Sequence, residues 1–175
     1  WLTLHFFETV PSKIIPEYGA NAGPRLEKLR RVVQKCGRYG IRIYPLCIEP
    51  AAFTWPHKEV AAAAAAHPDL VGHEGAFCTS TGKGQAYLEE AARTLFTGVP
   101  GLGGLIVIPV GERFTHCYSG LIPHDGPPFR NTCPRCSPRM PWEVLADTLS
   151  CLARGMHSAD PDAELIAWPY GQGIC

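Results

Sequence analysis

The order of strands and helices constrains this chain more than any other feature of its sequence. Short apolar segments of strand length alternate with longer segments whose apolar residues recur at helical spacing. The strand-like segments are 1–8, 41–48, 105–110 and 165–170. The amphipathic segments between them are 24–36, 87–95 and 141–156, and an alanine-rich stretch at 57–66 predicts one shorter helix. This alternation predicts an α/β fold with parallel strands and right-handed crossovers.

Two architectures use this repeat, the open doubly wound sheet and the closed (β/α)8 barrel. No glycine-rich phosphate loop of the form G-x-G-x-x-G or G-x-x-x-x-G-K-[ST] follows an expected strand, which favours the barrel. Four β/α units are about half of such a barrel, which typically needs about 250 residues. We therefore expect residues 1–175 to be part of a single domain, a partial (β/α)8 TIM barrel that packs against the remainder of the barrel.

The composition argues against two classes of partner. Lys and Arg together number 16, as do Asp and Glu, so we expect no nucleic acid ligand. No apolar run approaches the 18 or so residues that cross a bilayer, so we expect a soluble chain without a membrane partner. Trp1 already belongs to a strand pattern, which suggests that an N-terminal part is missing and leaves the compartment unknown.

Three glutamates, Glu8, Glu49 and Glu112, each stand where an apolar strand-like segment ends. In a parallel barrel these ends share one rim, and barrel enzymes carry their chemistry there. Carboxyl groups that face each other across a pocket are what glycosidic cleavage needs, one of them to protonate the leaving oxygen. Taken singly, each glutamate is explained equally well as a solvated loop residue or a helix-capping partner.

Other side chains near the expected rim suit a sugar-binding pocket. Trp168 and Tyr170 end the last strand-like segment and offer rings that stack on sugar faces. Arg113 stands beside the third glutamate, and His5 alternates inward on the first segment. A hydrogen-bonded core histidine is the competing interpretation of His5. We predict that these four residues contact substrate together with Glu8.

Two long segments resemble glycoside hydrolase family 20, the β-N-acetylhexosaminidases. RLEKLRRVVQKCGRYGIRIYPLCIEPAAF, at 25–53, is similar to a helix and the third barrel strand of that family, which has the form I-P-E-I-D-x-P-G-H. AFCTSTGKGQAYLEEAARTLFTGVPGLGGLIVIPVGE, at 76–112, resembles the family's next helix and its fourth strand, which ends in H-x-G-G-D-E. The chain is also similar to a looser group of family 20-like barrels, in which this strand continues into a His-Cys or Asn-Cys pair and a C-P-x-C.

The resemblance implies a glycoside hydrolase that acts on a glycoside or oligosaccharide, such as an N-acetylhexosaminide, without a cofactor. The family's general acid falls on Glu112, with Glu49 as the second catalytic carboxylate. The family's aspartate, which orients the substrate acetamido group, falls on Gly111, so Glu49 or Glu8 replaces it or the substrate differs. Two alternatives stay open. One is a non-catalytic carbohydrate-binding barrel; the other is a metal-dependent barrel hydrolase that uses histidines, namely His5, His116 or His124.

The segment 111–140 is predicted to be a long rim loop that carries a cysteine group. Cys133 and Cys136 have the C-x-x-C spacing of a metal knuckle, and Cys117 lies upstream with His116 or His124 available as a fourth ligand. Such a closed set predicts a structural zinc ion that pins the loop. A disulfide and plain reduced thiols are the competing interpretations. The other cysteines are interpreted as core fillers, namely Cys36, Cys47, Cys78, Cys151 and Cys175.

Overall fold

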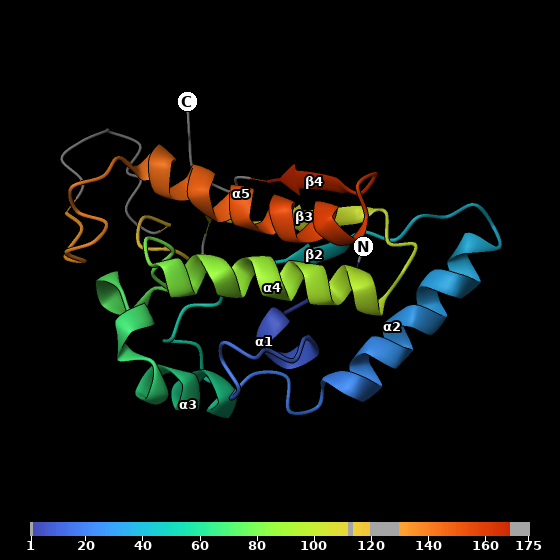
Figure 1. Cartoon of the computed structure of the whole chain (residues 1–175), viewed down its shortest axis with the longest axis horizontal. Coiled ribbons are helices and arrows are strands. Elements are labelled where there is room, and N and C mark those ends of the chain that lie inside the picture. The colour runs from blue at the N-terminus through green and yellow to red at the C-terminus, as the bar shows by residue number, and fades with distance from the viewer. Residues whose placement is uncertain (1, 112–113, 120–129, 169–175) are drawn as a thin grey trace.

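The computed structural model describes residues 2–111, 114–119 and 130–168 (Figure 1). Helices and strands alternate along these residues in the predicted order. The strands are β1 (Leu2–Leu4), β2 (Pro45–Cys47), β3 (Gly104–Val107) and β4 (Glu164–Ala167). The α-helices are α1 (Phe6–Thr9), α2 (Ala22–Gly37), α3 (Lys58–Ala66), α4 (Gly82–Gly98) and α5 (Pro141–Ala159), and two short 3-10 helices are η1 (Pro68–Leu70) and η2 (His73–Gly75).

The four strands form one sheet in the order β1-β2-β3-β4, and every neighbouring pair is parallel. Cys47 of β2 is paired with Leu4 of β1 on one side and with Val107 of β3 on the other. The predicted α/β class with parallel strands is therefore confirmed. Within the described residues the sheet is open, with β1 and β4 as its two edges.

Helices α4 and α5 lie side by side along most of their length and cover one face of the sheet (Figure 1). Leu88, Leu95 and Leu152 are fully buried between them and the strands, and burying each leucine contributes about 2 kcal/mol. Gly155 of α5 allows the close approach, because a Cβ at this position would lie 2.1 Å from the backbone oxygen of Glu89. The apolar spacing at 87–95 and 141–156 predicted two helices with one buried face each, and α4 and α5 confirm this.

On the face of the sheet that α4 and α5 do not cover, apolar side chains form a half-exposed row. Leu46 is paired with Ile106, which is paired in turn with Ile166, so the three side chains point to the same face. Leu46 and Ile106 are half-buried, and Ile166 is 42% exposed. Their neighbours Leu105 and Val107 point to the other face and are fully buried. The row is an apolar sheet face that the described residues only partly cover.

The first predicted strand is too long. β1 ends at Leu4, and helix α1 begins at Phe6, so Glu8 lies within a helix and not at the end of a strand. The reason is a long-range contact, because the carboxyl group of Glu49 accepts the backbone N–H of Phe6 at 2.7 Å and supports the first turn of α1. Aromatic content near the N-terminus favours a strand, but this tertiary contact outweighs it.

One further property concerns membranes. Among the helices of the described residues, none combines the length and the apolar character that a bilayer crossing requires.

Candidate metal centre

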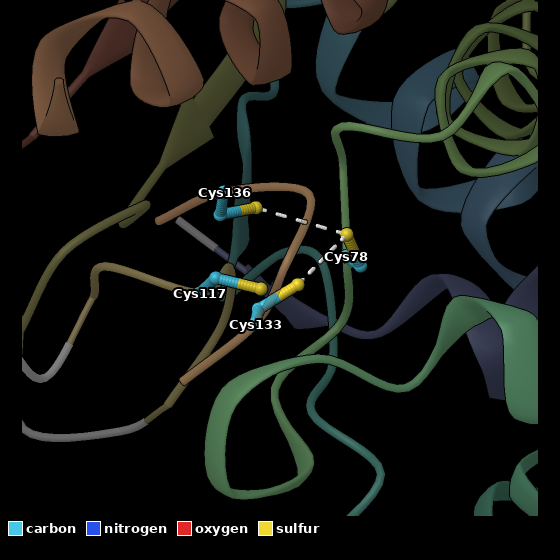
Figure 2. A group of neighbouring side chains, drawn as sticks. All are labelled: Cys78, Cys117, Cys133 and Cys136. Carbon is cyan, nitrogen blue, oxygen red and sulfur yellow. Dashed lines mark hydrogen bonds between the residues drawn. The ribbon is translucent and has the colours of Figure 1, made fainter. Parts of the chain in front are cut away.

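Four cysteine side chains from separate parts of the chain meet at one point (Figure 2). Cys78, Cys117, Cys133 and Cys136 are all buried, and their sulfur atoms lie within 4.8 Å of one another. The Sγ atom of Cys78 is 3.7 Å from the Sγ atoms of both Cys133 and Cys136. Four buried ligand atoms of one type, held this close, could bind a metal ion.

The sulfur spacing discriminates between the chemical forms that the group could take. A disulfide needs an S–S separation of about 2.05 Å, and all four cysteines are free. A tetrahedral zinc ion with Zn–S bonds of about 2.3 Å places its sulfur ligands about 3.8 Å apart. Two of the six sulfur–sulfur separations, both from Cys78, are 3.7 Å and match that edge length, and all six are within 4.8 Å. Four sulfur atoms this close together could bind a single metal ion.

A short parallel contact brings Cys78 beside Cys117. The backbone N–H of Phe77 donates to the carbonyl of Thr115 at 2.9 Å, and Phe77 forms an isolated parallel bridge with His116. The backbone N–H of Cys78 donates to the carbonyl of Leu70 at 2.8 Å, which ties this segment to η1. Each sulfur therefore sits on a backbone that is fixed by hydrogen bonds.

The C-x-x-C turn has its own supports. Its backbone closes with a hydrogen bond from the N–H of Cys136 to the carbonyl of Cys133 at 3.1 Å. Asn131 links this turn to the third ligand, because its Nδ2 donates to the carbonyl of Cys117 at 3.0 Å and its Oδ1 accepts the N–H of Cys133 at 2.9 Å. The hydroxyl of Tyr118 donates to the carbonyl of Cys136 at 3.0 Å. Side-chain amide and phenol groups thus hold the ligands in place of regular secondary structure.

Gly72 makes room for one of the ligands. A Cβ built at this position would lie 2.2 Å from the Sγ atom of Cys117, well inside van der Waals contact. A side chain here would push the sulfur away from its three partners. The backbone of Gly72 is extended, so this glycine is required for space and not for its dihedral angles.

Electrostatics within the group favour one thiolate in particular. The thiols of Cys117 and Cys136 and the guanidinium of Arg135 act as donors to Cys78 and hold its pKa below the usual range. Arg135 reaches the sulfur through its Nε at 3.1 Å. The pKa of Cys117 is raised instead, because its thiol acts as a donor to the neighbouring sulfurs of Cys136 and Cys78. The donors around Cys78, Arg135 among them, therefore favour its thiolate form, and thiolates are the form that binds metal.

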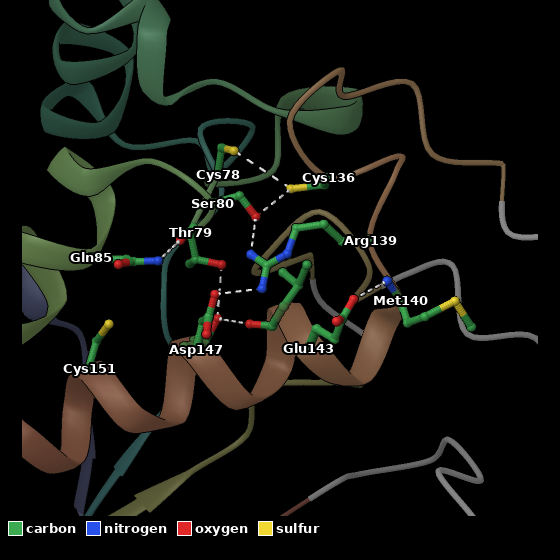
Figure 3. A network of polar contacts seen from close by, with 12 residues as sticks. Cys78, Thr79, Ser80, Gln85, Cys136, Arg139, Met140, Glu143, Asp147 and Cys151 are labelled. Carbon is green, nitrogen blue, oxygen red and sulfur yellow. Dashed lines mark hydrogen bonds and ion pairs between the residues drawn. The ribbon is translucent and has the colours of Figure 1, made fainter.

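A polar chain connects the centre to α5 (Figure 3). The Sγ atom of Cys136 is 3.2 Å from the hydroxyl of Ser80, which accepts a hydrogen bond from Arg139 at 2.9 Å. Arg139 in turn forms an ion pair with Asp147 of α5 at 2.7 Å. The C-x-x-C turn and the first part of α5 are thereby held to the segment that precedes α4.

The fourth ligand differs from the predicted one. The prediction of Cys117, Cys133 and Cys136 as one group agrees with the structure, but His116 is not a member of it, and Cys78 takes that place. The Nδ1 atom of His116 accepts the backbone N–H of Tyr118 at 3.2 Å, and burial lowers the pKa of the ring to about 4. His124, the other predicted candidate, lies outside the described residues.

Cys78 is fully buried in a small apolar cluster, as a core filler would be, but it also lies beside the other three sulfur atoms, which the sequence did not predict. This cysteine stands alone in the sequence, far from the C-x-x-C pair, in a stretch with weak periodicity. The hydrogen bond from Phe77 to Thr115 brings this segment beside the one that carries Cys117. No local sequence signal marks such a contact.

The predicted acidic residues lie in unlike environments. Glu49 follows β2 as predicted, but its carboxyl group is fully buried and accepts the N–H of Phe6 at 2.7 Å and that of Ala51 at 3.0 Å. Burial raises its pKa to about 8, although both hydrogen bonds act in the opposite direction. Glu8 is partly exposed, forms an ion pair with Arg25 at 3.0 Å and lines a cavity of about 230 Å³ beside α2. Glu49 does not line this cavity.

The remaining predicted substrate-binding residues are only partly placed. Glu112, Arg113 and Tyr170 lie outside the described residues. Trp168 follows β4, donates its backbone N–H to the carbonyl of Val107 at 2.8 Å and is 42% exposed. His5 is half-buried, and its ring packs edge-on against another aromatic ring, that of Trp55.

Comparisons of the chain with protein-family models, with curated proteins and with solved structures found no match.

Proposed function

We propose that this chain binds one Zn²⁺ ion through Cys78, Cys117, Cys133 and Cys136, and that the ion has a structural role. The meeting of four buried sulfur atoms within 4.8 Å of one another carries this proposal, and the two separations of 3.7 Å from Cys78 are close to the spacing of sulfur ligands around tetrahedral zinc. Four thiolates fill every coordination position of such an ion. A closed site of this kind leaves no position for a substrate or a reactive water molecule.

The ion would join three segments that have no sheet in common. Cys78 precedes α4, Cys117 follows β3, and the C-x-x-C turn precedes α5. Binding at this point connects the long predicted rim segment 111–140 to the core that α4 and α5 build. Because a preformed site rarely exists in an unfolded chain, the binding free energy of the ion adds to the stability of this arrangement.

Metal content tests the proposal. We expect about one zinc per purified chain by elemental analysis, and its loss in the double variant Cys133→Ser/Cys136→Ser. Cys151→Ser is the matched control, since Cys151 is equally buried but lies outside the group. A zinc content near zero in the unaltered chain, purified with zinc present and thiols reduced, would refute it.

We also propose, as a second function, that the sheet belongs to a (β/α)8 barrel that hydrolyses glycosides with Glu112 as proton donor. Two observations favour it. The four parallel strands follow one another in sequence order, as barrel strands do, and the half-exposed row of Leu46, Ile106 and Ile166 has the character of an inward barrel face. Glu49 follows β2 and Glu112 follows β3 in the sequence, and barrel enzymes carry their chemistry on the loops that follow strands.

In this second proposal Glu49 is a positioning residue. Its carboxyl group is closed off from solvent and holds the first turn of α1 against the end of β2. The substrate class is a glycoside or oligosaccharide, including N-acetylhexosaminides, and Trp168 would stack on a sugar ring.

Hydrolysis of aryl glycosides by the chain and its variants tests this second proposal. Glu112→Gln should lower turnover about 100-fold or more, as the loss of a general acid does. Glu74→Gln, whose parent side chain is 65% exposed, is the control and should leave the rate unchanged. Equal rates for Glu112→Gln and the unaltered chain would remove Glu112 from the mechanism. Sugar binding without turnover would favour the non-catalytic carbohydrate-binding alternative.

A further inference from the structure

Arg135, inside the C-x-x-C turn, reaches back across the metal centre to the ligand on the opposite segment. Its Nε donates to the Sγ atom of Cys78 at 3.1 Å, and its Nη2 donates to the carbonyl of Val71 at 2.8 Å. These two bonds fix the plane of the guanidinium against the segment that carries Cys78. The arginine is half-buried, so solvent screens its charge less than that of an exposed side chain.

The contact between Arg135 and Cys78 places a positive charge beside the negatively charged centre. Four thiolates around one Zn²⁺ carry a net charge of −2 in a buried place, and an uncompensated buried charge is costly. Among the described residues, Arg135 is the only cationic side chain with a hydrogen bond to one of the four sulfurs. Arg139 acts on Cys136 only through Ser80, and Asp147 offsets its charge (Figure 3).

We propose that Arg135 is a positioning residue of the metal centre, which orients Cys78 toward the C-x-x-C turn and compensates the charge of its thiolate. This inference rests on the proposed zinc site. Cys133 and Cys136 belong to one turn, and Asn131 connects Cys117 to that turn. Cys78 lies on a separate segment, and Arg135 connects it to the turn. The arginine links the turn and Cys78 directly before an ion arrives, and it reduces repulsion among the ligands afterwards.

Three variants separate this role from simple charge effects. Arg135→Met keeps most of the apolar stem but removes the donors and the charge. Arg135→Lys keeps the charge but not the two-point fork. Arg130→Met removes a charge from an exposed position in the same segment and is the matched control.

Zinc affinity is measured in the 175-residue chain by competition with a chromophoric chelator. Arg135→Met should weaken zinc binding about 10- to 100-fold, the usual effect of losing a partner of a metal ligand. Arg135→Lys should fall between Arg135→Met and the unaltered chain, and Arg130→Met should bind as the unaltered chain does.

Cobalt substitution adds a signature that a purely structural role would not produce. A hydrogen bond to a thiolate withdraws electron density from sulfur, so its loss should move the sulfur-to-cobalt charge-transfer band of Arg135→Met to lower energy. An affinity within about twofold of the unaltered chain together with an unmoved band would overturn the inference. Equal losses in Arg135→Met and Arg130→Met would also overturn it. Failure of the unaltered chain to bind zinc or cobalt would refute the zinc proposal itself, a distinct outcome.

Discussion

The cysteine centre and the site around Glu49 both bury ionisable side chains, but they favour opposite charge states. Glu49 has two backbone donors and, in the part of the chain that the structure describes, no ion-pair partner; burial raises its pKa to about 8, so it keeps its proton at neutral pH. The cysteine centre collects four ionisable groups and adds Arg135 as a donor, which favours a thiolate at Cys78. The neutral carboxyl group of Glu49 needs no counter-ion, whereas several buried thiolates repel one another unless a bound cation balances their charge.

This comparison predicts that removing metal has the largest effect on the molecule. A chelator should lower the melting temperature by about 10 °C or more, since a loss of a few kcal/mol shifts a domain of this size by that amount. Protease cleavage should appear within 111–140 at the same time. Thermal unfolding and limited proteolysis before and after chelation measure both effects, and added zinc should restore the original behaviour. An unchanged melting temperature after complete metal removal would contradict a structural ion.

Packing around the centre gives the next effect in size. Gly72→Ala places a methyl group 2.2 Å from the Sγ atom of Cys117, so the ligand must move. We expect zinc affinity to fall at least about 10-fold. Gly82→Ala is the matched control, because a Cβ at Gly82 meets nothing within 4 Å. Isothermal titration with zinc compares the two variants, and equal affinities would show that the sulfur has more freedom than the structure indicates.

The pH dependence of stability tests the other half of the comparison. Because the folded state raises the pKa of Glu49 from 4.5 to about 8, its stabilising contribution is complete below about pH 4.5 and is lost as pH rises through 8. This group alone should lower the free energy of unfolding by up to about 1.4 kcal/mol per pH unit within that window. Glu49→Gln does not titrate and should lack this slope.

Urea unfolding of both chains between pH 5 and 8, with zinc saturating, measures the difference. Glutamine keeps only one of the two acceptor oxygens, so the variant also loses one of the two backbone hydrogen bonds, which costs about 1–3 kcal/mol at every pH and leaves the slope unaffected. Parallel curves for Glu49→Gln and the unaltered chain would show that Glu49 is ionised in the folded state.

The smallest effect is expected at the exposed acid. Glu8 pairs with Arg25 at a partly solvated position, where the two side chains are 25% and 50% exposed. Glu8→Gln should therefore change the free energy of unfolding by less than about 1 kcal/mol. The same urea experiment measures it. A larger loss would place Glu8 closer to the behaviour of Glu49 than its surroundings suggest.

The sequence predicts the parts of this fold that depend on periodicity. The helix signals at 24–36, 87–95 and 141–156 lie within α2, α4 and α5, because apolar spacing reports directly which face of a helix is buried. The parallel sheet follows from the alternation of strand and helix. Glu49 was also correctly placed after a strand, since a run of apolar residues marks where a buried strand stops.

The features that the sequence does not predict depend on contacts between distant residues. The strand predicted at 1–8 ends early because Glu49 accepts the N–H of Phe6. Cys78 joins the metal centre because Phe77 pairs with Thr115. Burial of the Glu49 carboxyl group likewise depends on packing that its neighbours in sequence do not determine. Each of these features depends on contacts between residues that are far apart in the sequence.

X-ray absorption at the zinc edge tests the central claim most directly. For the zinc-loaded chain we predict four sulfur scatterers at about 2.3 Å and no nitrogen or oxygen ligand. A first shell that contains nitrogen or oxygen, or fewer than four sulfurs, would contradict a centre built from Cys78, Cys117, Cys133 and Cys136.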